Sequence, residues 1–257
     1  MLTVHAVLAD TTTRPPLVLV HGAANSGVVW RFWQAELAAR GWSSWALDLR
    51  GHGPSPPVGL ERVTMTDYAD DVVALMTELA RPPVVVGWSM GGLAAMMAAA
   101  RLRPAAFIGL APSPPSRSRD HAASLRDGTF GPEEYGILGR DPDDQPTMPD
   151  LDGDERRVAL ASLGAESRRA RDDRKAGIVL TRLPCPALVI ASTTDHTFPP
   201  RAYADLPVPA EPLVVEGASH WGLVLNRRLL ATLVPAVLDW ISRATRGPVG
   251  PPAPPSP

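Results

Sequence analysis

Residues 82–92 read PPVVVGWSMGG, and this stretch decides the fold of the chain. Three consecutive valines predict a buried strand, which ends abruptly at a Gly-x-Ser-x-Gly sequence. Residues 93–102, LAAMMAAARL, are strong helix formers and follow directly. A serine with glycines on both sides can occupy a sharp strand-to-helix turn, because no neighbouring Cβ atoms clash there. The stretch therefore predicts a strand–turn–helix unit that exposes the hydroxyl of Ser89.

Other short apolar stretches surround this unit and alternate with helical patterns. Amphipathic helices are expected at 29–40, 67–80 and 228–243, with Thr66 as the N-cap of the second, and Val4–Leu8 is expected as an edge strand. The other strand candidates, most of them apolar throughout, are Leu17–Val20, Ser44–Leu47, Val84–Val86, Ala106–Leu110, Ala187–Ala191 and Leu213–Val215. Continuous apolarity is typical of strands covered on both faces. The alternation predicts an α/β fold with a doubly wound, mostly parallel sheet.

Residues 113–178 interrupt the alternation. They hold clusters of Pro and Asp and one long charged helical pattern at about 154–175, but no convincing strand. An insertion after a core strand lies above the carboxyl ends of the strands, where open α/β sheets bind ligands. We therefore expect a helical cap at 113–178 on a core of 1–112 and 179–246. The alternative is a long surface connection, and the Pro-rich tail at 247–257 is expected to be disordered.

Composition excludes several classes of protein. The formal net charge is −2, which gives no reason to expect nucleic acid or an anionic membrane as a partner. No apolar stretch reaches the length of about 18 residues that a membrane span requires, and the first ten residues do not resemble a secretory signal. The only cysteine, Cys185, allows no intrachain disulfide and suits a reducing compartment, so we expect a cytoplasmic protein. The oligomeric state stays open.

Two loops that follow later strands carry an acid and a base for the serine. A serine hydroxyl is a poor nucleophile until a base takes its proton, and the base needs an acceptor that fixes its tautomer. Asp195 follows the strand at 187–191, and His220 follows the strand at 213–215. The order Ser89, Asp195, His220 is the nucleophile–acid–base order of one hydrolase fold.

The competing residues fit these roles less well. Glu216 lies too near His220 in sequence to be its partner, and His196 directly follows the acid. We expect His21 and His52 to bond neighbouring turns, and His5 and His121 to lie on the surface. The acidic cluster between 141 and 154 lacks a calcium-loop pattern. No metal and no cofactor are expected.

The chain resembles the α/β-hydrolase family, serine-nucleophile branch, over nearly all of residues 15–244. Four matching segments carry the resemblance: 20–23 (VHGA), 47–55 (LDLRGHGPS), 87–92 (GWSMGG), and the acid and base loops with Asp195, Pro199 and His220. The elbow at 87–92 is similar to that of small bacterial carboxylesterases. The resemblance implies an oxyanion hole formed by the backbone amides of Met90 and Ala23, with Ala24 as the alternative to Ala23.

These residues predict a serine hydrolase that cleaves a carboxylic ester through an acyl-enzyme, with a small-molecule ester or thioester as substrate. The same constellation also serves a natural-product thioesterase or cyclase, a lactonase, a C–C hydrolase and a cofactor-free haloperoxidase-like perhydrolase. A hypothesis from another class is a ligand-binding receptor with little turnover. Catalytic turnover distinguishes the enzymes from the receptor.

Overall fold

The protein is described here by a computed structural model, which covers residues 1–9 and 13–246. Within them, a seven-stranded sheet has the order β1-β3-β2-β4-β5-β8-β9. Its strands are β1 (Val4–Val7), β2 (Leu17–Val20), β3 (Ser44–Leu47), β4 (Val84–Trp88), β5 (Ala106–Leu110), β8 (Ala187–Ser192) and β9 (Glu211–Val215). Only β1 runs antiparallel to its neighbour. The predicted mostly parallel, doubly wound sheet is confirmed; the expected disordered tail lies outside the described residues.

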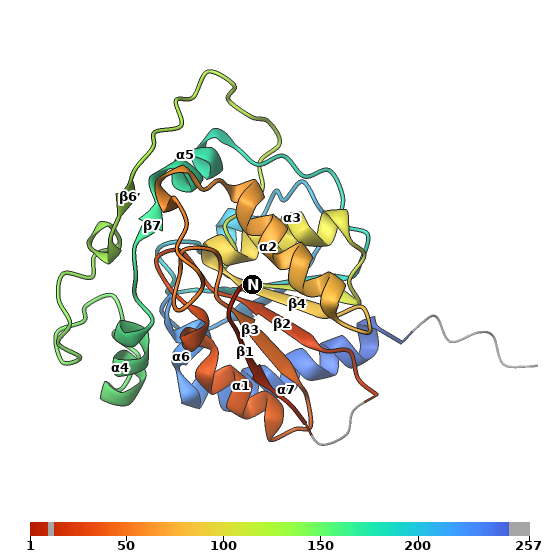
Figure 1. Cartoon of the computed structure of the whole chain (residues 1–257). Helices are drawn as coiled ribbons and strands as arrows, with labels where there is room; N and C mark the ends of the chain where they lie inside the picture. Colours follow the sequence, from red (N-terminus) through yellow and green to blue (C-terminus); the bar gives the residue numbers. More distant parts are fainter. Residues whose placement is uncertain (10–12, 247–257) are drawn as a thin grey trace, which may run out of the picture.

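Helices cover both faces of the sheet (Figure 1). The main ones are α1 (Arg31–Ala38), α2 (Met65–Glu78), α3 (Ser89–Arg101) and α7 (Arg227–Ala244). Successive residues of a strand point to opposite faces, and in β2 Leu19 belongs to the core beneath α1 and α7, whereas Val18 belongs to the core beneath α2 and α3. Both faces of the central strands are therefore buried, which explains their uninterrupted apolar sequences.

Helix α2 begins earlier than predicted. Its N-cap is Thr64, whose hydroxyl accepts a hydrogen bond from the Asp67 N–H, while the Asp67 carboxylate accepts one from the Thr64 N–H. Thr66 lies inside the first turn, so its prediction as the N-cap is wrong. A reciprocal capping box satisfies two otherwise unbonded backbone donors, and this favours the earlier start.

Besides a 3₁₀ helix at Pro132–Tyr135, the segment between β5 and β8 folds into two short strands and two short helices at one end of the sheet (Figure 1). They are β6 (Thr129–Phe130), α4 (Gly153–Ala161), β7 (Glu166–Ser167) and α5 (Arg168–Ala176), and β6 pairs with β7 antiparallel. The prediction of one helix over 154–175 and no strand is therefore wrong. The Ser167 hydroxyl accepts from the Ala170 N–H and starts α5 as a separate helix.

The first turn of α3 packs against the loops that follow β2 and β5 with no room for side chains. A Cβ atom on Gly91 would lie 2.0 Å from the carbonyl oxygen of His21, and one on Gly92 would lie 2.5 Å from the Cβ of Pro112. Glycine at these positions lets the backbones touch. The contact holds the start of α3 at the carboxyl edge of the sheet.

We expect Gly91→Ala to lower the free energy of unfolding by about 3 kcal/mol, because the added methyl group forces α3 away from the His21 carbonyl. Alanine would otherwise favour a helix interior. Gly139→Ala is the matched control, since its Cβ would meet no described atom within 4 Å. Urea unfolding of both variants checks the expectation, and equal midpoints would contradict it.

Candidate active site

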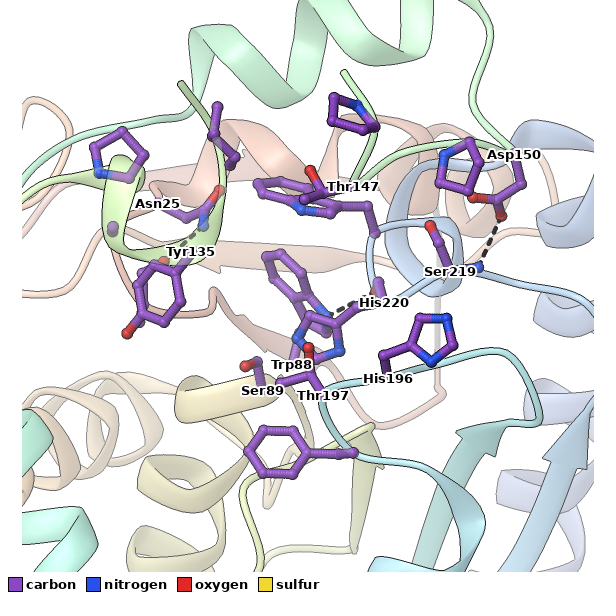
Figure 2. A pocket seen from close by; sticks show the side chains of 18 of the residues that line it. Asn25, Trp88, Ser89, Tyr135, Thr147, Asp150, His196, Thr197, Ser219 and His220 are labelled. Atoms are coloured by element: carbon purple, nitrogen blue, oxygen red, sulfur yellow. Dashed lines mark hydrogen bonds between the residues drawn. The ribbon is translucent and has the colours of Figure 1, made fainter. Parts of the chain in front are cut away.

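Ser89 occupies the turn between β4 and α3. Its φ of +54° lies in the left-handed region, which non-glycine residues seldom adopt. The preceding strand ends at Trp88 and the helix begins at Ser89 itself, so the connection contains no loop residue. Such local strain persists only where the surrounding structure enforces it. The turn directs the Ser89 side chain into a cavity (Figure 2).

Asp195 and His220 meet at the ends of two neighbouring strands. The Asp195 Oδ2 atom lies 2.7 Å from the His220 Nδ1, and its Oδ1 accepts from the backbone N–H groups of Thr197 at 2.7 Å and Phe198 at 3.0 Å. Burial alone would raise the pKa of Asp195, but the His220 ring and the two N–H donors bring it below the usual value. The buried carboxylate therefore stays ionised and can orient the imidazole.

Trp88, the residue before Ser89, joins the serine turn to the histidine loop. Its indole N–H donates to the carbonyl oxygen of His220 at 3.2 Å, and the two ring centroids are 5.1 Å apart. Ser89, His220 and Ala23 all line one cavity of about 530 Å³. Figure 2 shows Trp88, Ser89 and His220 on the same part of its wall. The structure thus brings Ser89 and His220 to one cavity, and Asp195 reaches it only through its hydrogen bond to His220.

The loop after β2 supplies a second part of the site. Ala24 has a φ of +55°, and its N–H donates to the Glu166 Oε2 at 3.0 Å. The Ala23 N–H, by contrast, has no acceptor among the described residues. Met90 lies in the first turn of α3, where backbone N–H groups lack a partner within the helix. Ala23 and Met90 therefore offer backbone donors next to Ser89, whereas the Ala24 N–H is already bonded.

Glu166 is a fully buried carboxylate that reaches this loop from the inserted segment. Besides the Ala24 N–H it accepts the Tyr68 hydroxyl, and it lies 3.4 Å from the His52 Nε2. Burial alone would raise the pKa of Glu166, but these partners lower it well below the usual value. The same contact raises the pKa of His52 against the effect of its burial. The ionised carboxylate is thus held by groups from three parts of the chain.

Two more hydrogen bonds connect the inserted segment to the same loop. The Gly164 N–H donates to the Ala24 carbonyl oxygen at 2.9 Å, and the Ser162 hydroxyl donates to the Asn25 Oδ1 at 2.7 Å. The Asn25 amide in turn donates to the Ala23 carbonyl oxygen. The sequence carries no local signal for the two bonds from the inserted segment, because each joins residues more than 130 positions apart.

Of the remaining histidines, His196 also lines the cavity, whereas His21, His5 and His121 lie elsewhere. His21 is buried and accepts from the Leu49 N–H at its Nε2, and burial lowers its pKa to about 3, so it remains neutral. His5 differs from the prediction of a surface residue, because its Nε2 lies 2.7 Å from the buried Asp48 carboxylate and its side chain is 34% exposed. His121 is exposed. These three rings lie outside the cavity that Ser89 and His220 line.

In the part of the chain that the structure describes, no group of three or more His, Cys, Asp or Glu side chains is arranged to hold a metal ion. Nor does any helix there have the length and apolarity to cross a membrane. Burial raises the pKa of the Cys185 thiol to about 11, so this cysteine is not an activated nucleophile.

Comparison with known proteins agrees with this architecture. The profile of the Alpha/beta hydrolase family matches residues 17–232, and the chain belongs to that family, as the sequence motifs predict. An esterase from Thermogutta terrifontis has a similar structure, with a TM-score of 0.68, 21% identity and 93% of each chain covered.

Curated relatives match over shorter segments. Protein phosphatase methylesterase 1 of Mus musculus is 36% identical over 102 residues, which is 37% of this chain and 26% of the relative. The non-heme chloroperoxidase CPO-A1 of Kitasatospora aureofaciens is 31% identical over 129 residues, covering 48% and 46%. The chain spans less than half the length of these relatives.

We expect Glu166→Gln to lower the free energy of unfolding by about 1–3 kcal/mol. A glutamine has one acceptor oxygen and cannot serve the Ala24 N–H, the Tyr68 hydroxyl and His52 together. Glu134→Gln is the matched control, because this carboxylate pairs with two arginines at the surface of the same segment, where ion pairs contribute little. Urea midpoints measure both, and a loss no larger than the control's would contradict the expectation.

Proposed function

We propose that the chain is a serine hydrolase that cleaves carboxylic esters, with Ser89 as nucleophile, His220 as general base and Asp195 as its orienting acid. The contact between Asp195 and His220, at the cavity that the strained Ser89 turn also lines, carries this proposal. Nucleophile, base and orienting acid are the parts that acyl transfer to a serine requires. We propose residues 113–178 as the cap and 1–112 with 179–246 as the core.

The mechanism follows from the tautomer that Asp195 selects. When the His220 Nδ1–H donates to the Asp195 carboxylate, the neutral ring presents its Nε2 lone pair as a base. Nε2 takes the Ser89 proton while Oγ attacks the carbonyl carbon of the ester. The imidazolium then returns the proton to the departing alkoxide, which leaves as an alcohol. Water, deprotonated by the same nitrogen, hydrolyses the acyl-enzyme and restores Ser89.

The negative oxygen of each tetrahedral intermediate needs donors that already face it. We propose the backbone N–H groups of Ala23 and Met90 for this role. The engagement of the Ala24 N–H by Glu166 supports Ala23 over Ala24. Ala24 and Asn25 hold the loop after β2 by hydrogen bonds. The Ala23 N–H is therefore positioned before the substrate binds, and the loop need not reorganise as charge develops.

The cavity and the relatives support a small-molecule ester. A volume of about 530 Å³ suits a small ligand, and Trp88, Phe198 and Trp221 give the wall an apolar character. A methylesterase and an esterase are among the proteins similar to this chain. A cytoplasmic location is proposed on the single, unpaired cysteine.

A second candidate is perhydrolysis, favoured by the 31% identity to a non-heme chloroperoxidase. Hydrogen peroxide would then replace water in attack on the acyl-enzyme and release a peracid. Bromination of monochlorodimedone in acetate, peroxide and bromide measures this activity. A rate that depends on Ser89 and exceeds ester hydrolysis would favour it over the first proposal.

We expect Ser89→Ala to lower the kcat for 4-nitrophenyl esters by on the order of 10⁶, because no other group forms the acyl-enzyme. A series from acetate to octanoate, followed at 400 nm, provides the measurement and sizes the acyl site. Ser118→Ala, which removes an exposed serine hydroxyl, is the control and should keep wild-type rates. Comparable turnover in Ser89→Ala and wild type would refute the assignment.

Asp195→Asn should lower kcat by on the order of 10⁴, because the amide stabilises the wrong tautomer of His220 and no longer stabilises its charged form. Glu216→Gln changes the same kind of group in the exposed neighbouring loop, where Glu216 accepts from the Thr193 hydroxyl. It should keep the wild-type rate. A near-normal rate for Asp195→Asn, or a large loss for Glu216→Gln, would indicate another acid.

A further inference from the structure

One positive charge lines the proposed active-site cavity without a carboxylate partner. Arg174 lies in the last turn of α5 and is among the residues of the cavity wall that Ser89 and His220 share. Its Nη1 donates to the hydroxyl of Ser113 at 3.2 Å. Ser113 in turn donates its backbone N–H to the Ser89 carbonyl oxygen at 2.8 Å. Arg174 is thus two hydrogen bonds away from the nucleophile.

The other arginines of α5 form ion pairs with carboxylates. Arg168 and Arg171 both pair with Glu134, and Arg169 pairs with Asp127 at 2.7 Å. Among the described residues, no carboxylate lies within 4.0 Å of the Arg174 guanidinium. A partly buried guanidinium that lacks a carboxylate keeps its remaining N–H donors available to a planar anion.

Tyr135 adds a polar hydroxyl beside this charge. Tyr135 and Arg174 both line the cavity. Burial raises the pKa of Tyr135, and the charge of Arg174 opposes that rise. The nearest acidic group of the wall, Asp150, lies across the cavity from Tyr135, with Ser89 and His220 between them (Figure 2). Asp150 accepts from the Ser219 N–H there. The end of the cavity at Arg174 and Tyr135 is therefore positive.

We propose that Arg174 binds a carboxylate of the substrate, so that the enzyme prefers esters that carry a free carboxylate over neutral esters of the same length. This inference rests on the proposed ester hydrolysis. Tyr135 completes the subsite as a hydroxyl donor. A carboxylate accepts two parallel N–H bonds from a guanidinium, which gives orientation as well as affinity.

Arg174 has an alternative structural role, which the experiment must separate. Basic residues in the last turn of a helix interact favourably with the helix dipole. Lys175 shares that turn but is exposed and does not line the cavity. It therefore serves as the matched control for charge at the end of α5.

Two substrate pairs test the proposal through the ratio of kcat/KM for the anionic ester to that for the neutral ester. The acyl pair is the 4-nitrophenyl monoester of glutaric acid and 4-nitrophenyl pentanoate. The alcohol pair is 4-carboxyphenyl butanoate and 4-carbamoylphenyl butanoate. The two pairs together determine which half of the ester carries the carboxylate.

The wild type should prefer the anionic ester in at least one pair. Arg174→Gln should lower that ratio about ten- to hundredfold, and any effect common to both esters cancels in the ratio. Arg174→Lys should keep part of the preference, and Lys175→Gln should keep all of it.

Equal ratios in wild type and Arg174→Gln for both pairs would overturn the subsite, as would a wild-type preference for the neutral esters. A parallel loss in Lys175→Gln would also overturn it, since the effect would then belong to the helix end. Failure of the ester hydrolysis itself is distinguishable, because all four esters would then be left intact or be cleaved equally by Ser89→Ala.

Discussion

The turn at Ser89 is the constraint on which the rest of the site depends. Backbone of α3 touches backbone of the loop after β2, because Gly91 leaves no side chain between them. The same contact brings the loop that carries Ala23 against the helix start that carries Met90. The left-handed φ of Ser89 costs of order 1–3 kcal/mol. Packing of the surrounding backbone, and not the local preference of a serine, maintains it. The fold therefore supplies the energy that holds the Ser89 side chain at the cavity.

A second constraint is electrostatic. Glu166 brings a negative charge into the interior, and desolvation of such a charge is costly unless donors surround it. The Ala24 N–H, the Tyr68 hydroxyl and the Ser167 N–H provide those donors, and the His52 Nε2 lies 3.4 Å from the carboxylate. An apolar cluster could stabilise the protein as well, but it would not define the position of a loop. The buried Glu166 carboxylate fixes the position of the loop that carries Ala23, through its bond to the Ala24 N–H.

The sequence predicts the core well because its signals there are local. Valine runs, the glycine pattern at 87–92 and the apolar periodicity of the helices each depend on residues within one turn or strand. The order of Asp195 and His220 after their strands is also local, since parallel strands end at one edge. One boundary differs from the prediction. Because no loop residue separates β4 from α3, the helix begins at Ser89 and not after the glycines.

The inserted segment could not be predicted in the same way. Residues 154–175 have the charge and length of one helix, and only Ser167 marks the start of a second. The two helices are separated because the residues between them bond to a distant loop. The Gly164 N–H and the Glu166 carboxylate both form hydrogen bonds with Ala24, about 140 positions earlier. His5 shows the same effect, because a buried aspartate 43 residues later draws in a residue with surface character.

The bonding of Glu166 has a consequence for how this protein could diversify. In many modular proteins an inserted segment can be exchanged while the scaffold keeps its chemistry. Here Ser162, Gly164 and Glu166 come from the insertion, whereas Ala24, Asn25 and Tyr68 come from the scaffold. A chimaera that receives a foreign insertion would lose the support of the loop that, with Ser89, lines the cavity. Segment exchange, in evolution or in the laboratory, must therefore transfer both halves of this network together.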